Sequence, residues 1–167
     1  DLEKFSFNEH LRDSMREKYD VIEELTFGHV GGFNPQKNHE FVLKIFREII
    51  KIEANAKCFF IGAGPLKEYI ENKASDVKSN IIFVGTTDDV PAYLDMFDGM
   101  ILPSVFEGLP LVAVEWQING LPCILSDTIT SQCAVMDTVR FMSLNDDPKE
   151  WAKEIIRLAR KNVEKRS

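Results

Sequence analysis

The chain has 167 residues, of which 44% are hydrophobic, so we expect one domain with a sizeable core. Its 20 Lys and Arg stand against 27 Asp and Glu, and the net charge of −7 argues against nucleic acid as a partner, because phosphate binding needs a basic face. No apolar run reaches the length of a membrane span, and no signal-peptide pattern opens the chain.

Helical and extended patterns alternate along the whole chain. Strands are expected at residues 25–30, 58–61, 81–84, 100–102, 123–125 and 139–142, with helices at about 8–19, 38–53, 66–74, 88–96, 110–118 and from 147 onward. Alternation with short connections predicts an α/β fold: a doubly wound, Rossmann-like sheet of six parallel strands with helices on both faces. We expect one such domain over residues 1–167. Because the chain opens at Asp1 without an initiator Met, we also expect a longer parent protein.

The first helix looks like a charged surface helix. Asn8 can cap it, and Leu11, Met15 and Tyr19 form one apolar stripe at helical spacing. At the other end of the chain, residues 157–166 are basic, and we interpret them as a solvated helix end rather than a membrane contact.

The first strand runs directly into Gly31-Gly32. Two glycines at a strand end allow a sharp turn and a close approach of the backbone to a ligand, although an ordinary turn fits equally well. Lys37 falls at the start of the following helix, where a cation is unfavourable unless an anion also binds there; a solvated lysine is the alternative. His29, inside the strand, is expected to be a packed core histidine.

Two further strand ends carry glycines. Gly62-Ala63-Gly64 opens a helix like half of a dinucleotide-binding fingerprint, but Lys67 replaces the third glycine, so NAD binding is only weakly indicated. The loop Val84-Gly85-Thr86 follows the third strand. Thr87 or Asp88 can cap the short helix that follows. The adjacent acids Asp88-Asp89 could suggest a metal site, but we expect them to cap the helix and complement its dipole.

The most informative stretch follows the fourth strand and contains Glu107, Gly108, Leu109, Pro110 and Glu115. The first four residues lead into an apolar helix whose N-terminus can hold a phosphate, with Pro110 in the first turn. A carboxylate at position 107 is better placed for hydroxyls than for phosphate. Glu115 interrupts the apolar helix and needs hydrogen-bond donors, either from inside the protein or from a ligand. Two carboxylates, hydroxyls and a phosphate together describe a nucleotide sugar.

The cysteines are Cys58, Cys123 and Cys133. Their spacing does not form a metal-ligand pattern, and two of them lie in predicted strands. We therefore expect buried free thiols in a reducing compartment, which places the protein in the cytoplasm.

These motifs together resemble the retaining glycosyltransferases of the GT-B fold, family 4. Glu107 and Glu115, eight positions apart, are similar to the family's E-x7-E motif. Further similarity lies in His29-Val30-Gly31-Gly32-Phe33, Gln36-Lys37-Asn38-His39, Phe83-Val84-Gly85 and Pro103-Ser104. The bacterial capsule and exopolysaccharide branch is resembled most, through the combination of Glu107-Gly108-Leu109-Pro110 with Gly120-Leu121-Pro122-Cys123-Ile124 and Ser126-Asp127.

The resemblance implies a role for each motif. Glu107 would be the catalytic residue facing the donor sugar, and Glu115 would hold the ribose hydroxyls. The amides of Gly108 and Leu109, with Lys37, would hold the diphosphate. The full set of donor-binding residues would be Gly31, Gly32, Lys37, Gly62, Gly64, Val84, Gly85, Thr86, Glu107, Gly108, Leu109, Pro110 and Glu115. No cofactor and no metal ion are expected, in agreement with the absence of an Asp-x-Asp motif. Gly32 departs from the family, which usually has an arginine there on the diphosphate.

The resemblance also implies partners. This chain would be the C-terminal, donor-binding half of a two-domain enzyme that uses a nucleotide sugar, most simply a UDP-sugar. A glycan or lipid-linked acceptor would bind an N-terminal domain, in surface polysaccharide synthesis at the inner face of the membrane, with peripheral membrane association of the parent. The chain alone is expected to be inactive. The alternatives are a sugar-nucleotide epimerase and a non-catalytic binding or regulatory module in which Glu115 is only structural.

Overall fold

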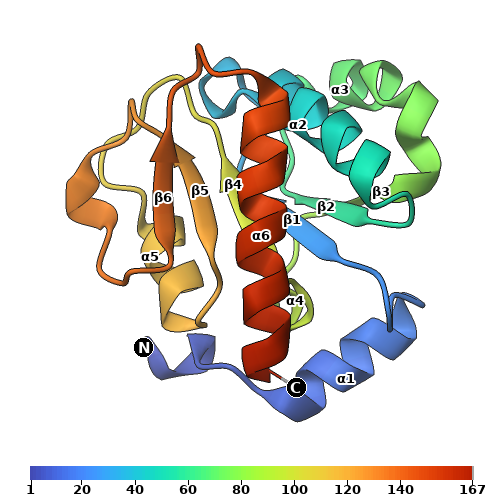
Figure 1. Cartoon of the computed structure of the whole chain (residues 1–167), viewed down its shortest axis with the longest axis vertical. Helices are drawn as coiled ribbons and strands as arrows, with labels where there is room; N and C mark the ends of the chain where they lie inside the picture. The colour runs from blue at the N-terminus through green and yellow to red at the C-terminus, as the bar shows by residue number, and fades with distance from the viewer. Residues whose placement is uncertain (167) are drawn as a thin grey trace.

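The computed structural model describes residues 1–166 and contains one parallel sheet (Figure 1). The strands are β1 (Thr26–Val30), β2 (Lys57–Ile61), β3 (Ile81–Gly85), β4 (Gly99–Leu102), β5 (Cys123–Ser126) and β6 (Val139–Met142). They lie in the order β3-β2-β1-β4-β5-β6, and all neighbouring pairs are parallel. The predicted six-stranded, doubly wound sheet is confirmed.

The helices also follow the prediction. They are α1 (Glu9–Lys18), α2 (His39–Ile52), α3 (Lys67–Lys73), α4 (Val90–Met96), α5 (Leu111–Ile118) and α6 (Pro148–Arg166), with short 3-10 turns at Glu3–Phe5, Pro35–Lys37, Ser75–Asn80 and Ser131–Cys133. The predicted cap of α4 is wrong. Asp89 occupies the cap position without a side-chain cap bond, and the Thr87 hydroxyl instead accepts the N–H of Asp89.

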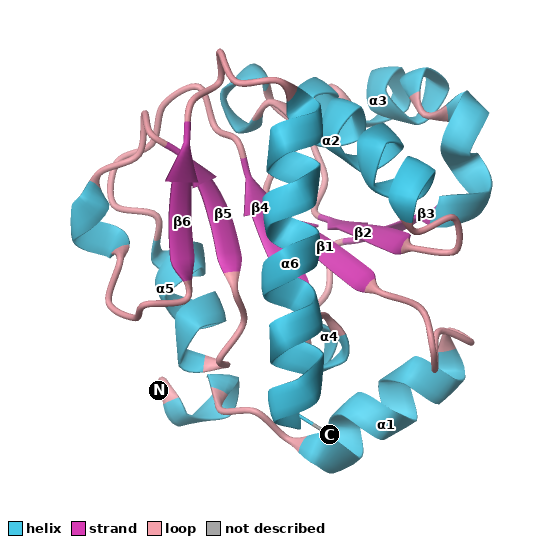
Figure 2. Ribbon diagram, in the orientation of Figure 1, coloured by secondary structure: helices cyan, strands magenta, loops and turns pink. Residues whose placement is uncertain are grey.

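Helices cover both faces of the sheet (Figure 2). One core contains side chains of α2, α3 and α6, and the other contains side chains of α4 and α5. Strand residues alternate between the two cores: Phe60 packs into the first, and its neighbour Phe59 packs into the second. Because both faces of the central strands are buried, residues such as Cys58–Ile61 of β2 and all of β4 are apolar, and each buried Phe contributes roughly 1.5–3 kcal/mol.

The buried face of α1 differs from the prediction. Met15 and Tyr19 pack against the core, but Leu11 is 42% exposed, whereas Arg12 and Arg16 are buried. Arg12 Nη1 donates to three carbonyl oxygens at the end of α4, each at 3.1 Å, and Arg16 Nη1 donates to the Met96 carbonyl at 2.7 Å. The last carbonyls of a helix have no partner within the helix, and the two guanidinium groups supply the missing donors.

Asp98 balances the charge of these two arginines. Its carboxylate lies 2.6 Å from Arg12 Nη2 and 3.5 Å from Arg16 Nη1, and it accepts the Thr26 N–H at 2.9 Å. Asp98 has no exposed surface. The cluster therefore attaches α1 to the start of β1 and to the turn between α4 and β4.

The end of α6 is less solvated than predicted. Arg157 and Arg160 are exposed, as expected. Arg166 instead donates to the carbonyl oxygen of Asn119 at 2.7 Å and to its side-chain oxygen at 2.6 Å, and lies over the ring of Phe7. Burial lowers the pKa of Arg166 to about 10. It thus supplies donors at the C-terminus of α5, an interaction that a charge count does not reveal.

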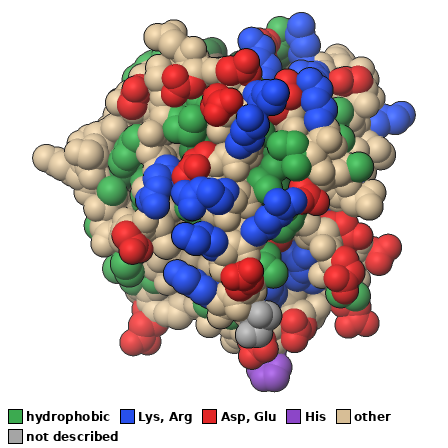
Figure 3. Space-filling view, viewed as in Figure 1, with side chains coloured by type: hydrophobic (Ala, Val, Ile, Leu, Met, Phe, Trp, Pro, Cys, Tyr) green, Lys and Arg blue, Asp and Glu red, His purple; other side chains and the backbone are tan. Residues whose placement is uncertain are grey.

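Basic side chains gather on the outer face of α6 (Figure 3). Exposed lysines and arginines of this helix include Lys153, Arg157, Arg160, Lys161 and Lys165. Several of them pair with acids, as Arg157 does with Glu154 at 2.6 Å. Because the whole chain carries −7, the rest of the molecule holds an excess of acidic groups.

Replacing Asp98 with Asn should destabilise the fold strongly. The change leaves two buried arginines without their counter-ion, and breaking a buried pair costs about 3–5 kcal/mol. Urea unfolding measures the difference. Asp76→Asn is the matched control, since Asp76 pairs with Arg47 at the surface, where such a bridge contributes about 0–1 kcal/mol. Equal losses in the two variants would contradict the assignment of Asp98 to the α1 attachment.

Candidate functional site

The candidate site lies where the strand order reverses. β1 and β4 are neighbours in the sheet, yet the chain leaves them toward opposite faces, into α2 and α5. In open parallel sheets, such a point creates a crevice at the C-terminal ends of the strands, which is where ligands bind. The loops after β1 and β4 therefore form the walls of the candidate site.

These two loops are joined by hydrogen bonds. The Val105 N–H donates to the Gln36 carbonyl at 2.9 Å, and the Asn38 amide donates to the Pro103 carbonyl at 2.9 Å. Asn38 has a φ of 60° and connects the 3-10 turn Pro35–Lys37 to α2. Asn tolerates this left-handed conformation better than most residues. The geometry thus presents Gln36 and Lys37 to the loop after β4.

Glu107 is the centre of the site. Its carboxylate forms an ion pair with Lys37 and accepts hydrogen bonds from Ser104 Oγ at 3.1 Å and Gln36 Nε2 at 3.4 Å. Only 8% of the Glu107 side chain is exposed. The sequence assigned Lys37 and Glu107 to different parts of a ligand, and the structure brings them into direct contact.

Ser104 and Gln36 are site residues to which the sequence assigned no role. Both lie within motifs that the sequence analysis identified, Pro103-Ser104 and the loop before α2. The sequence did not reveal that both side chains donate to the Glu107 carboxylate. Ser104 is fully buried. A buried carboxylate with an ion pair and two neutral donors is well satisfied, which explains how the acidic side chain is tolerated there.

The start of α5 faces open space beside Glu107. A Cβ at Gly108 would meet nothing within 4 Å, and the N–H groups of Gly108 and Leu109 form no hydrogen bond within residues 1–166. Pro110, predicted in the first turn, lies just before the helix, with φ −77° and ψ 100°. Free N–H groups at a helix N-terminus attract anions.

Glu115 is only partly buried, in contrast to the prediction. Ala113, Trp116 and Gln117 form the buried side of α5, and Glu115 lies off it. Its carboxylate has no hydrogen bond within the described chain. Burial raises the pKa of Glu115, and the charge of Lys4 opposes this shift. The sequence left two sources of donors open for Glu115, the protein or a ligand, and residues 1–166 do not supply an internal donor.

Gly62 and Gly64, two of the glycines predicted to bind the donor, lie where the loop after β2 packs against the loop after β1. A Cβ at Gly62 would lie 2.1 Å from the Gly31 carbonyl oxygen, and one at Gly64 would lie 2.6 Å from that of Phe33. Both glycines have positive φ, at 139° and 154°. They are needed for close contact between backbones, so their surroundings are filled by protein.

The other glycines lie nearer the crevice. The stem of Lys37 covers Gly31, with Cε 3.2 Å from a Cβ placed there, and a Cβ at Gly32 would meet the Asn34 amide at 3.2 Å. Gly85, with φ 82°, has open space, and its carbonyl accepts the Gly62 N–H at 2.8 Å. Thr86 is exposed, and Val84 is partly buried. The loop Val84-Gly85-Thr86 follows β3, and β2 and β1 lie between β3 and β4. Three strand spacings, about 14 Å, therefore separate this loop from the Glu107 loop along the C-terminal ends of the strands.

A pair of buried histidines supports the loop after β1. His29 and His39 have ring centroids 4.5 Å apart, and His39 stacks on Phe33 at 4.1 Å. Among the described residues, no group forms a hydrogen bond with any of the four ring nitrogens. Burial lowers the pKa of both histidines, and the Lys37 charge acts in the same direction, so that the pKa of His39 falls to about 4. The predicted core role of His29 is confirmed, whereas its contact with His39 was not foreseen.

The remaining chemistry of the chain lies elsewhere or is inert. All three cysteines are free and buried, as predicted. Within residues 1–166, no group of three or more His, Cys, Asp and Glu side chains is placed to share a metal ion. No helix in that range is both long and apolar enough to cross a membrane.

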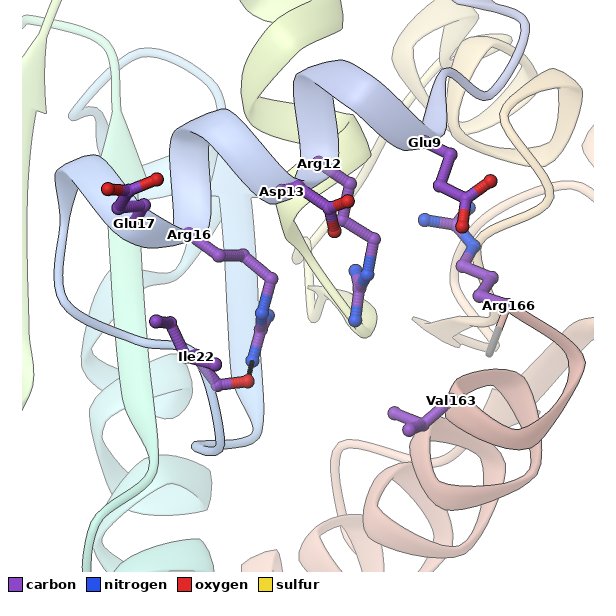
Figure 4. Close-up of a pocket in the computed structure, with 8 residues that line it drawn as sticks. All are labelled: Glu9, Arg12, Asp13, Arg16, Glu17, Ile22, Val163 and Arg166. Atoms are coloured by element: carbon purple, nitrogen blue, oxygen red, sulfur yellow. Dashed lines mark hydrogen bonds between the residues drawn. The ribbon is translucent and has the colours of Figure 1, made fainter.

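A cavity of about 430 Å³ lies between α1 and the end of α6 (Figure 4). Arg12, Arg16 and Arg166 line it together with Glu9, Asp13 and Glu17. The arginines already donate to protein carbonyls and the acids balance their charge, so the cavity is not an anion site. Two of its lining residues, Arg12 and Arg16, pair with Asp98 just before β4, whereas Glu107 follows the C-terminal end of that strand.

The chain is similar to known proteins over most of its length. The sequence model of the family described as "Glycosyl transferases group 1" matches residues 24–161. The putative glycosyltransferase EpsF of Bacillus subtilis is 36% identical over 163 residues, covering 95% of this chain and 42% of that protein. An Escherichia coli relative, "UDP-Gal:alpha-D-GlcNAc-diphosphoundecaprenol alpha-1,3-galactosyltransferase", is 32% identical, covering 81% of this chain and 36% of its own length. The chain thus spans about two fifths of these relatives.

Solved structures share the fold. HepE from Anabaena, in complex with UDP and glucose, has a TM-score of 0.82 at 14% identity, covering all of this chain and 50% of HepE. The C-terminal domain of LpcC from Francisella tularensis has a TM-score of 0.78 at 18% identity, covering 95% of this chain and 86% of that domain. At these identities the likeness concerns the fold alone.

The buried histidines should make stability depend on pH. His39 is neutral in the folded protein down to about pH 4, whereas an unfolded histidine takes up a proton near pH 6.5. Its contribution is therefore complete above pH 6.5 and is lost as the pH falls toward 4, by about 3 kcal/mol. Urea unfolding of wild type and His39→Gln at several pH values measures this, and the variant should show the shallower slope.

His10 supplies the control, because it is an exposed histidine on α1. His10→Gln should leave the slope of the wild type unchanged. If His39→Gln had the same slope as wild type, the proton uptake on unfolding would belong to other groups.

Proposed function

The chain belongs to the group 1 glycosyltransferases, and we propose that it is the donor-binding part of a retaining, metal-independent, family 4 enzyme that uses a nucleotide sugar. The observation that carries the proposal is the loop pair at the β1–β4 crevice. It places an ammonium group, a carboxylate and the free amides of a helix N-terminus side by side. A phosphorylated sugar needs this combination of groups.

Each part of the donor has a matching group. The free N–H groups of Gly108 and Leu109, together with Lys37, hold the diphosphate, whose negative charge grows as the sugar leaves, so the same groups stabilise the transition state. Glu107 accepts hydroxyls of the transferred sugar. Glu115, whose carboxylate accepts no hydrogen bond within residues 1–166, accepts the ribose hydroxyls. The base lies at Val84-Gly85-Thr86, farther along the sheet edge.

A UDP-sugar is the proposed donor. The solved structures with this fold include HepE in complex with UDP-glucose, and the E. coli relative is named for UDP-Gal. Gly32 has no side chain that could reach a diphosphate, so Lys37 and the backbone N–H groups of Gly108 and Leu109 hold it in this proposal.

The acceptor and the setting are part of the same proposal. The E. coli relative is named for a sugar-diphosphoundecaprenol acceptor, and another relative is an uncharacterized protein of a Klebsiella pneumoniae cps region. These names support transfer to a lipid-linked or glycan acceptor in surface polysaccharide synthesis. We propose that the parent works on the cytoplasmic side of the membrane, with peripheral membrane association. We propose that the acceptor binds a domain beyond this chain and that the chain alone does not transfer sugar.

Family membership favours transfer over the two alternatives, a sugar-nucleotide epimerase and a non-catalytic module. An epimerase would interconvert UDP-sugars with no acceptor present. A non-catalytic module would bind no donor. Both can be separated from the proposal by donor binding and product analysis.

Calorimetry with UDP-sugars and GDP-sugars should detect binding to the chain, and Glu115→Gln should weaken it about tenfold to a hundredfold. The reason is the loss of charge-assisted hydrogen bonds to ribose, which contribute roughly 1.5–3 kcal/mol. Stability should change by less than about 1 kcal/mol, because the carboxylate forms no hydrogen bond or ion pair within residues 1–166.

Glu150→Gln, at an exposed position of α6, is the control and should leave affinity unchanged. A chain that binds no nucleotide sugar, either alone or within its longer parent, would exclude a donor site. A Glu115→Gln variant that loses stability but keeps full affinity would make Glu115 a structural residue.

A further inference from the structure

We propose that Ser104 is a positioning residue that keeps the Glu107 carboxylate turned toward the donor sugar while Lys37 is engaged by the diphosphate. This inference rests on the proposed donor site and concerns how its acidic group is oriented. It assigns a function to a buried hydroxyl that would otherwise be regarded as part of the core.

The position of Ser104 is fixed from the neighbouring strand. Its carbonyl oxygen accepts hydrogen bonds from Ser126 Oγ at 2.6 Å and Thr128 Oγ1 at 2.7 Å, and these two hydroxyls lie 2.9 Å apart. Ser126 ends β5, which pairs with β4. Ser104 itself is fully buried, so its hydroxyl has few alternatives to the Glu107 carboxylate, 3.1 Å away.

Ser104 matters because the other close partner of Glu107 carries a charge. Lys37 pairs with Glu107 when no donor is bound, but a diphosphate at the adjacent amides attracts the same ammonium group. A neutral hydroxyl is not drawn away in this manner. Gln36 also donates, at the longer distance of 3.4 Å. The Ser104 hydroxyl is then the shorter neutral contact that holds the carboxylate in place.

Because Ser104 orients only the Glu107 carboxylate, its loss should affect the binding of the transferred sugar and not that of the diphosphate. A nucleoside diphosphate lacks the transferred sugar and its ribose lies at Glu115, so it brings no hydroxyl to Glu107 and its affinity does not depend on how the Glu107 carboxylate points. A nucleotide sugar does depend on it. A hydrogen bond to a charged group corresponds to about tenfold or more in affinity, and misplacing the carboxylate should remove that gain.

The test is calorimetry of wild type, Ser104→Ala and Ser104→Cys with UDP and with the UDP-sugar that wild type binds most tightly. We expect UDP affinity to stay within about twofold, while the ratio of UDP-sugar affinity to UDP affinity falls about tenfold. Ser104→Cys keeps the shape and weakens the donor, so it should change the ratio in the same direction if Ser104→Ala folds poorly. Ser79→Ala, on an exposed turn, is the control.

A double-mutant cycle separates positioning from a general packing effect. In a Glu107→Ala background, Ser104→Ala should change the ratio no further, because no carboxylate remains to be oriented. Equal losses for UDP and UDP-sugar, an unchanged ratio, or an additive loss in the double variant would each overturn the inference while leaving donor binding intact. A wild type that binds neither ligand would overturn the proposed function, and the inference with it.

Discussion

The ion pair between Lys37 and Glu107 is the contact on which the arrangement of the site depends. It joins residues 70 positions apart, and it forms because β1 and β4 are neighbours whose chains diverge. The two charges cancel, so the crevice gains no positive field from them, and the chain as a whole is acidic. An anionic ligand must therefore be held by nearby donors, and the N-terminus of α5 supplies them.

Much of the fold could be predicted because its signals are local. Continuous apolar strands such as Cys58–Ile61, followed by glycines and helical patterns, indicate buried parallel strands and short crossovers. The residues of the site could be named for the same reason, since glycines and acids at strand ends stand out. The pairing of Lys37 with Glu107 could not, because it depends on strand order, which spacing along the chain does not reveal.

The charged residues of the interior were hidden for a different reason. Arg12, Arg16 and Arg166 occur in charged stretches, which normally face water. Here they supply donors to carbonyls at the ends of α4 and α5, and that need arises only once the helices are packed. Glu115 was misjudged for a related reason. Apolar residues surround it in the sequence of α5, which indicates burial, but its side chain lies at the margin of the buried side of the helix. The sequence pattern does not distinguish half burial from full burial at such a position.

The glycines also determine where this crevice can be altered by substitution. Gly62 touches the backbone of the neighbouring loop, so a side chain there would push the two loops apart. Gly85 has space for a side chain, but its φ of 82° is a backbone conformation that residues with a side chain rarely adopt. Gly108 has both space and an unstrained backbone. Natural divergence and laboratory evolution can therefore reshape the crevice most easily at this position, by placing new side chains directly beside Glu107.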